Sequence, residues 1–273
     1  MKAFYFKIII GAGLMSMMIM GCDTKIEDCL DASATNFNPI ADNNCCCTYP
    51  ELQMQLSYNL YSRDSSGFAL NTTYNDDFGN PFQITNIPFY ISQFQVIDAN
   101  GNRTGVTDEV TLYLNDGTTQ TVEDNFNIVK TNTFRYSIGT FSATGDYTQI
   151  RFLVGLDATA NQTVPDSMEA THPLAISSDS LYVSNTEGYI FTKAEVITDT
   201  STTTTTTYTV QGDANLVEVI LDAPITIAKG VDTRYEINVD FLKLFEGVNF
   251  QTDDATTIST KIQANTGNIF QLE

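Results

Sequence analysis

Residues 145–161 constrain the fold of this chain more than any other stretch of its sequence. Apolar side chains occupy every second position of one run within this stretch, namely Ile150, Phe152, Val154 and Leu156. A two-residue period of this kind is typical of a β-strand that buries one face. The run ends in short polar side chains, among them Asp157 and Asn161, so the strand would present a polar rim there. That rim is either a binding site or an ordinary solvated loop.

The same alternation recurs from residue 51 onward, most clearly in the runs 52–60, 110–114, 217–221 and 235–239. Turn-forming residues separate these runs, including the Asn-Gly pair at 100–101. We therefore predict an all-β fold for residues 51–273, an antiparallel β-sandwich with long loops. One short C-terminal helix is expected at residues 241–246, with Asp240 as its N-terminal cap.

Two segments interrupt the regular strand pattern. In residues 87–98 the apolar positions change phase between Ile91 and Phe94, which predicts a β-bulge. Residues 162–185 have no clear period and are expected to form a long loop. Loops of this length inside a compact domain are usually functional or mobile.

Acidic residues greatly outnumber basic ones, with 33 Asp and Glu against 13 Lys and Arg and a net charge of −20. Such a surface repels phosphate backbones, so nucleic acid is not an expected partner. The charge suits solubility, loosely held divalent cations or a cationic partner, and solubility is the simplest explanation. A single His leaves little material for Ser-His-Asp or Cys-His catalysis. We therefore predict that the protein is not an enzyme.

Residues 1–21 have the form of a secretory signal peptide. Lys2 and Lys7 precede a 13-residue apolar run, which is too short to span a bilayer as a helix. The run ends in Gly21 and Cys22, which resembles the bacterial lipobox, whose Cys is acylated and begins the mature protein. The acidic patch at residues 23–28 resembles the surface-export signal of Bacteroidota lipoproteins. We expect an outer-membrane lipoprotein that faces the periplasm or the cell surface and contacts the membrane through its acyl chains.

Residues 22–50 are expected to form the lipid anchor and a Cys-rich stalk, which resembles a Cys-bounded repeat of secreted Bacteroidota proteins. Besides the lipid-attachment Cys22, this segment contains Cys29, Cys45, Cys46 and Cys47. Four thiols allow two disulfides in any of three pairings, all of which stay open. Calcium could bind to Asp31, Asn36, Asn38 and Asp42. A metal-free, disulfide-stapled stalk is the preferred interpretation, because the spacing is not that of an EF-hand loop.

Four segments between about residues 51 and 273 resemble, in order and spacing, the family of MbnP-type copper-binding proteins. They contain Tyr90-Ile91-Ser92 with the turn at 98–101, Gly145-Asp146-Tyr147 with Asp157 and Asn161, Gly188-Tyr189-Ile190-Phe191, and Val239-Asp240 with Lys243-Leu244-Phe245. The resemblance implies a secreted or lipid-anchored β-sandwich. It assigns Asp157, Asn161, Gly188 and Tyr189 to the rim of the family motif. Type members of the family bind copper through His and an oxidised Trp, so copper is the cofactor that the resemblance implies.

The metal-ligand positions of this family are changed in this chain. Where the family has a Met-Tyr-Trp-x-Trp run, residues 181–185 read Leu-Tyr-Val-Ser-Asn, and the sequence contains no Trp. Gln211 takes the position of a family His. The remaining donors of the kind that copper prefers include His172 and Met168, which do not make a metal site on their own because copper needs several convergent ligands.

The sequence therefore predicts a lipid-anchored, non-enzymatic binding protein of the MbnP-like type, with copper handling as the inherited role. The alternative is a surface lipoprotein that has lost the metal site and keeps the fold to bind a small ligand or a protein partner. The two hypotheses differ in whether the protein contains copper.

Overall fold

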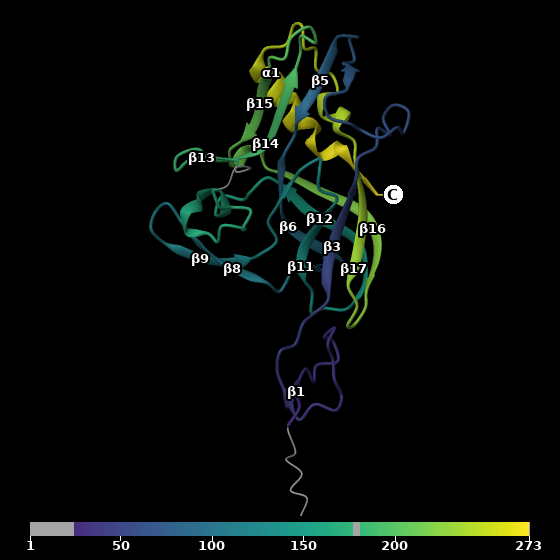
Figure 1. Cartoon of the computed structure of the whole chain (residues 1–273), viewed down its shortest axis with the longest axis vertical. Helices are drawn as coiled ribbons and strands as arrows, with labels where there is room; N and C mark the ends of the chain where they lie inside the picture. Colours follow the sequence, from purple (N-terminus) through teal and green to yellow (C-terminus); the bar gives the residue numbers. More distant parts are fainter. Residues whose placement is uncertain (1–24, 177–180, 273) are drawn as a thin grey trace, which may run out of the picture.

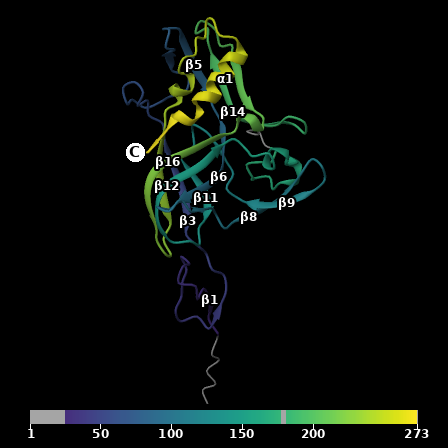
Figure 2. The same ribbon diagram turned by 180° about the vertical axis from the view of Figure 1, so that it is seen from behind.

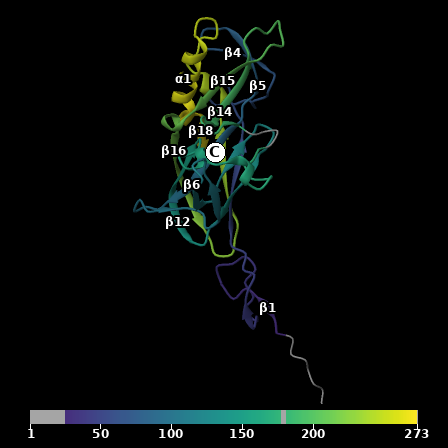
Figure 3. The same ribbon diagram turned by 90° about the vertical axis from the view of Figure 1, so that its left-hand side faces the viewer.

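The computed structural model of the chain describes residues 25–176 and 181–272, so the predicted signal peptide and Cys22 lie outside the described residues. Two stacked, mainly antiparallel sheets form the body, which confirms the predicted β-sandwich (Figure 1). The helix α1 (Ala255–Asn265) lies at one end of this body, and residues 25–50 hang from the other end, as Figure 3 shows from the side. Within the described ranges, none of the helices has the length and apolar character needed to cross a bilayer.

The larger sheet is built around six strands in the spatial order β16 (Val217–Ile227), β12 (Gly145–Val154), β6 (Phe89–Ile97), β14 (Gly188–Ile197), β5 (Pro81–Asn86) and β4 (Thr73–Asn75). Four shorter strands extend it: β7 (Arg103–Thr104) and β10 (Asn127–Val129) pair with β6, and β13 (Tyr182–Ser184) and β15 (Thr206–Gln211) pair with β14. All these pairs are antiparallel. The strand predicted first from the sequence, β12, is therefore an interior strand of this sheet, paired with β16 on one side and β6 on the other.

The smaller sheet has the order β11 (Arg135–Thr140), β3 (Glu51–Ser57), β17 (Thr233–Val239) and β18 (Phe270–Leu272). Its central pair, β3 and β17, runs parallel, which departs from the all-antiparallel expectation. Parallel neighbours need a crossover connection, and here nearly the whole larger sheet lies between the two strands in the sequence. The hairpin β8 (Glu109–Tyr113) and β9 (Thr119–Glu123) projects from the side of the body, as Figure 2 shows from behind.

The main core lies between the two sheets and is rich in aromatic rings. Phe152 of β12 stacks on Phe94 of β6 at 6.0 Å and meets Phe270 of β18 edge-on at 5.0 Å. The alternating residues of β3 complete this layer, because Leu52, Met54 and Leu56 are all buried. The alternation in the sequence therefore marks the face of each sheet that points to the other sheet.

A second, smaller core covers the outer face of the larger sheet. It joins β6, β14, the hairpin β8–β9 and the loop after β12, through Tyr90, Leu112, Phe126, Leu156, Ala160, Leu174, Leu181, Tyr189 and Phe191. As a result both faces of β12 are buried beyond Ile150, and Arg151, on the face opposite the main core, is only 8% exposed. Arg151 Nε donates to Glu218 Oε1 at 2.7 Å, which compensates part of the cost of burying its charge.

The predicted bulge is confirmed in β6. The register between β12 and β6 shifts between Arg151 and Leu153, because β6 has an extra residue at this point. Gln93 takes up the extra length with a φ of +49°, a left-handed conformation that few non-glycine residues adopt. The phase change in the sequence therefore marks a real kink in a central strand.

Helical structure is short. Residues Phe241–Phe245 form a 3₁₀ helix, and Asp240 Oδ1 caps it by accepting from Leu242 N at 3.1 Å, as the sequence predicts. Four further 3₁₀ segments cover Ala160–Gln162, Pro165–Ser167, Asp213–Asn215 and Thr266–Ile269. The longer helix α1 is missing from the sequence prediction. It is mostly polar and buries only Ile258 and Ile262, which are four residues apart on one face.

The segment of residues 25–50 carries the two-residue strands β1 (Glu27–Asp28) and β2 (Asn43–Asn44). One disulfide, Cys29–Cys47, closes it. It touches the sandwich where Gly230 N donates to the carbonyl of Ser33 at 3.2 Å, and it continues through Pro50 into β3. We call residues 25–50 the stalk.

Candidate functional site

The polar rim begins with a tight turn at the end of β12. Asp157 Oδ1 accepts from Ala160 N at 2.8 Å, and the Asp157 carbonyl accepts from Asn161 N at 2.8 Å. These two bonds close the 3₁₀ turn Ala160–Gln162. The carboxylate of Asp157 therefore has a local structural task before any ligand is considered.

Asn161 connects this turn to the start of β14. Its Oδ1 accepts from Tyr189 N at 2.9 Å, and its Nδ2 donates to Asp213 Oδ1 at 2.9 Å. Gly188 has a φ of +70°, and a Cβ at this position would lie 2.3 Å from Asn161 Oδ1. Glycine is required there because both the backbone conformation and the close approach exclude a side chain. The structure thus brings Asn161, Gly188 and Tyr189 together as a structural clamp.

Two buried tyrosines fix the loop that follows. Tyr189 donates its hydroxyl to the carbonyl of Leu174 at 2.7 Å, and Tyr90 donates to the carbonyl of Pro173 at 3.0 Å. Burial raises the pKa of both phenols, so they stay neutral donors. The two hydroxyls hold the chain next to His172.

His172 is more enclosed than an exposed loop residue, since its side chain is 10% exposed. Its Nδ1 accepts from Leu174 N at 3.1 Å, which leaves the proton on Nε2 facing Asp124 Oδ1 at 3.2 Å. The ring also packs edge-on against Phe126 at 5.8 Å. Neither ring nitrogen has a free lone pair in this arrangement, and Met168 packs against the second core instead of completing a site.

The segments that carry the positions of the family's metal ligands, residues 181–185 and Gln211, flank the start of β14 on opposite sides. Tyr182 of β13 pairs with Tyr189 on one side, and Gln211 of β15 pairs with Ile190 on the other. The side chains at these positions are amides, hydroxyls and aliphatic groups, without the imidazole and sulfur donors that copper prefers. In the described part of the chain, no group of three His, Cys, Asp or Glu side chains could hold a metal. The residues present do not fit a copper centre.

A cavity of about 240 Å³ opens beside the bulge in β6, and we call it the bulge cavity. It is lined by Gln93, Gln95, Val122, Glu123, Asn125, Phe126, Asp157 and Ala160. Gln93 is held there from two directions, because its N–H donates to Asn125 Oδ1 at 2.7 Å and its side-chain amide donates to Asp157. Arg151 Nη1 also donates to the Gln93 carbonyl at 3.1 Å. The bulge, the rim and the buried Arg therefore form one polar network.

The residues that line the bulge cavity include acceptors with few hydrogen-bond partners. Gln95 Oε1 is buried without a hydrogen-bond partner among the described residues. Among residues 25–176 and 181–272, the Glu123 carboxylate receives a single long bond, from Asn125 Nδ2 at 3.3 Å, and burial raises its pKa. A buried acceptor without a partner costs free energy, so a donor placed between these groups would be stabilised. Gln95, Glu123 and Asn125 were not among the predicted site residues, although the phase change at 87–98 pointed to this location.

A second cavity of about 390 Å³ lies on the other side of residues 124–127. His172, Asp124, Asp108 and Glu169 contribute to its wall. Because Asn125 and Phe126 line both cavities, the two hollows are separated by this single segment.

The cysteine residues of the stalk are arranged in one bridge and one adjacent pair. Cys29 and Cys47 form the disulfide, whereas Cys45 and Cys46 carry free thiols. The proposed calcium ligands bond within the stalk. Asp31 accepts from Ser33 N and Tyr49 Oη, Asp42 accepts from Ile26 N, and the amides of Asn36 and Asn38 bond to Cys46, Thr48, Asp28 and Ile40.

A sequence model of the MbnP family matches residues 50–263. Among solved structures, MbnP from Methylosinus trichosporium is similar to this chain, with 14% sequence identity and a TM-score of 0.41 over 72% of this chain and 76% of that chain. No curated protein matches the chain. Since the family model covers well over half of the sequence, this chain belongs to the MbnP family.

Proposed function

We propose that this protein is a lipid-anchored, non-enzymatic binding protein of the MbnP family, and that its ligand is a small molecule rich in hydrogen-bond donors. The bulge cavity carries this proposal. Its lining residues carry acceptors with few hydrogen-bond partners, above all the Glu123 carboxylate and Gln95 Oε1, which is buried in the cavity wall. Its volume of about 240 Å³ suits an amine or an amino sugar.

The rigidity of this cavity supports a binding role. Gln93 and Asp157 are fixed by hydrogen bonds to each other and to the backbone, and Asn125 is only 2% exposed. Groups that are already held in place lose little conformational entropy when a ligand binds. The pattern therefore fits recognition of a ligand without chemistry on it.

The lipid anchor at Cys22 is proposed from the sequence alone. The apolar run at residues 8–20 and the lipobox-like Gly21-Cys22 support export and acylation, and attachment to the outer membrane is part of the proposal. Metabolic labelling with a radioactive fatty acid tests this part. We expect label on the wild type and none on Cys22→Ser, whereas equal labelling of both contradicts the anchor.

Thermal unfolding with ethanolamine, glucosamine and glucose tests the ligand class. Glucosamine and glucose differ by one ammonium group, so their comparison isolates the contribution of charge. We expect the amines to raise the Tm of the wild type more than glucose does, because a ligand that binds only the folded state stabilises it.

Two Gln→Leu variants sharpen this test. Gln95→Leu removes the unpartnered acceptor, and Gln120→Leu makes the same change at an exposed position of β9 outside the cavity. The shift should vanish in Gln95→Leu and persist in Gln120→Leu. The absence of a shift with all three probes in the wild type, or an equal shift in both variants, contradicts the proposal.

Copper handling is the alternative that the family suggests, because its type members bind copper, although both ring nitrogens of His172 are engaged, by Leu174 N and by Asp124. Metal analysis of the protein isolated from its native host, followed by copper titration of wild type and His172→Ala, separates the two. Stoichiometric copper that is lost in His172→Ala supports copper handling. If neither protein binds the metal, the small-ligand proposal is favoured.

A further inference from the structure

Residues 45–47 of the stalk are three consecutive cysteines with different environments. Cys47 is bridged to Cys29, whereas Cys45 and Cys46 are free. In an extended chain neighbouring side chains point to opposite sides, so two adjacent thiols are normally far apart. Cys46 breaks this rule with a φ of +57°, in the left-handed region. As a result the Sγ atoms of Cys45 and Cys46 lie 2.7 Å apart.

The backbone around this pair is held from both sides. Asn36 Nδ2 donates to the Cys46 carbonyl at 2.8 Å, and Asn36 Oδ1 accepts from Thr48 N at 2.9 Å. On the other side, Asn44 Oδ1 accepts from Leu30 N at 2.8 Å. The stalk's own hydrogen bonds therefore hold the backbone segment from which the two sulfurs approach each other.

We propose that Cys45 and Cys46 close a second, vicinal disulfide, which opens and closes by exchange with external thiols and disulfides while Cys29–Cys47 stays intact. A covalent bond needs the two sulfurs to approach by less than about 1 Å. Exposure explains the difference in lability between the bridges. Cys46 is exposed and Cys45 half-buried, whereas the other bridge joins a half-buried Cys47 to the fully buried Cys29, and exposed disulfides are the ones that exchange readily.

The exchange is balanced by an external disulfide, R–S–S–R, as the oxidant. The Cys46 thiolate attacks one of its sulfurs, which forms a mixed disulfide and releases one R–S⁻. Cys45 then gives up its proton as its sulfur attacks Cys46 Sγ, which forms the vicinal bond and releases the second R–S⁻. Two protons and two electrons leave the cysteine pair, and the external disulfide becomes two thiols.

Electrostatics favour Cys46 as the first nucleophile. The hydrogen bond with Cys46, burial and the nearby carboxylates of Glu27 and Asp28 raise the pKa of the Cys45 thiol to about 11. Cys45 is therefore protonated at neutral pH, whereas Cys46 is the exposed thiol of the pair. The reverse reaction, in which an external thiol attacks the exposed Cys46 Sγ, reopens the bridge.

Differential alkylation of the full chain tests this proposal. The protein is equilibrated in glutathione buffers of increasing oxidising strength, alkylated under denaturing conditions and digested with trypsin. Cleavage after Lys25 and Arg63 gives one peptide, residues 26–63, that contains all four stalk cysteines. Fragment masses then locate each alkyl group. We expect no alkyl groups on this peptide in the most oxidising buffer. At intermediate ratios of reduced to oxidised glutathione, two alkyl groups should appear, both within residues 45–46. Four alkyl groups should appear only under strong reduction.

The double variant Cys45→Ser, Cys46→Ser is the matched control, because it keeps the Cys29–Cys47 bridge and removes only the adjacent pair. It should lose the intermediate step and keep the strong-reduction step. Three results would overturn the proposal. Cys45 and Cys46 could both still react with the alkylating reagent after equilibration in excess oxidised glutathione, or one of them could be found paired with Cys29 or Cys47. The third result is that both bridges open at the same ratio of reduced to oxidised glutathione.

Discussion

Two hairpins of the larger sheet turn with the same pattern, Asp-x-x-Gly-Asn, but they have different surroundings. One is Asp76–Asn80, read DDFGN, and the other is Asp98–Asn102, read DANGN. In each turn the first Asp Oδ1 accepts two backbone N–H groups, and its Oδ2 accepts from the side chain of the last Asn at 2.8 Å. The glycines have φ values of +86° and +84°. The local geometry is thus the same in both turns.

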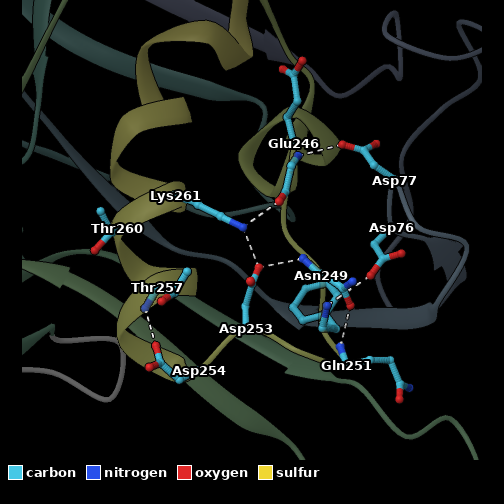
Figure 4. A network of polar contacts seen from close by, with 12 residues as sticks. Asp76, Asp77, Glu246, Asn249, Gln251, Asp253, Asp254, Thr257, Thr260 and Lys261 are labelled. Atoms are coloured by element: carbon cyan, nitrogen blue, oxygen red, sulfur yellow. Dashed lines mark hydrogen bonds and ion pairs between the residues drawn. The ribbon is translucent and has the colours of Figure 1, made fainter.

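The difference lies in what packs on them. Asp76 is only 6% exposed, because the segment before α1, which includes Asn249 and Gln251, packs onto it (Figure 4). Phe250 N in this segment donates to Asp76 Oδ2 at 3.1 Å. Asn80 also donates to Asn249 Oδ1 at 3.0 Å. The hydrogen bonds of Asp98 are exposed to solvent. A five-residue pattern therefore dictates the turn, whereas tertiary contacts decide how much stability depends on it.

The largest expected difference between the two turns is in the free energy of unfolding that is lost in Asp76→Ala and in Asp98→Ala. Asp76→Ala leaves four N–H donors without their acceptor in a buried place and should lower the free energy of unfolding by about 3 kcal/mol. Asp98→Ala should cost much less, because water can replace the lost acceptor. Urea unfolding of both variants measures this. Equal losses would show that the turn itself, and not its packing, carries the stability.

Acid should reduce the loss of stability that Asp76→Ala causes. Burial opposes ionisation of Asp76, but the hydrogen bonds from Asn80, Phe250 and Phe78 outweigh it and lower its pKa. A carboxyl with a lowered pKa stabilises the folded state above its unfolded pKa, and this contribution is lost as the pH falls through the folded pKa. The stability gap between wild type and Asp76→Ala should therefore narrow between about pH 5 and pH 2. If the difference in unfolding free energy between wild type and Asp76→Ala stayed constant across this pH range, the ionised Asp76 carboxylate would not be the stabilising group.

The same division between local pattern and tertiary contact explains what the sequence could predict. Alternation located β3 and β12, the phase change located the bulge at Gln93, and Asp240 was identified as a cap. The parallel pairing of β3 with β17 was missed because it joins distant segments. The helix α1 was missed because its surface is rich in Thr, which is typical of strands, and its apolar face is narrow.

The candidate site was only half predictable for the same reason. Asp157 and Asn161 were found because they follow a strand, but their roles depend on partners far along the chain, such as Tyr189. Gln95 and Glu123 look like ordinary polar residues of exposed strand faces. They line a cavity because the bulge and the hairpin β8–β9 approach each other in space.

The smallest difference in stability between the two turns is expected when their glycines are replaced by Ala. At both Gly79 and Gly101 a Cβ would meet nothing within 4 Å, so Ala fits without a clash. The cost then comes from the left-handed backbone alone, about 1 kcal/mol for each. Gly79→Ala and Gly101→Ala should therefore shift the urea midpoint by the same amount, although their aspartates differ. A larger loss for Gly79→Ala would mean that the contact between Phe250 and Asp76 depends on the exact shape of the turn, so local geometry and tertiary packing could no longer be treated as separate contributions.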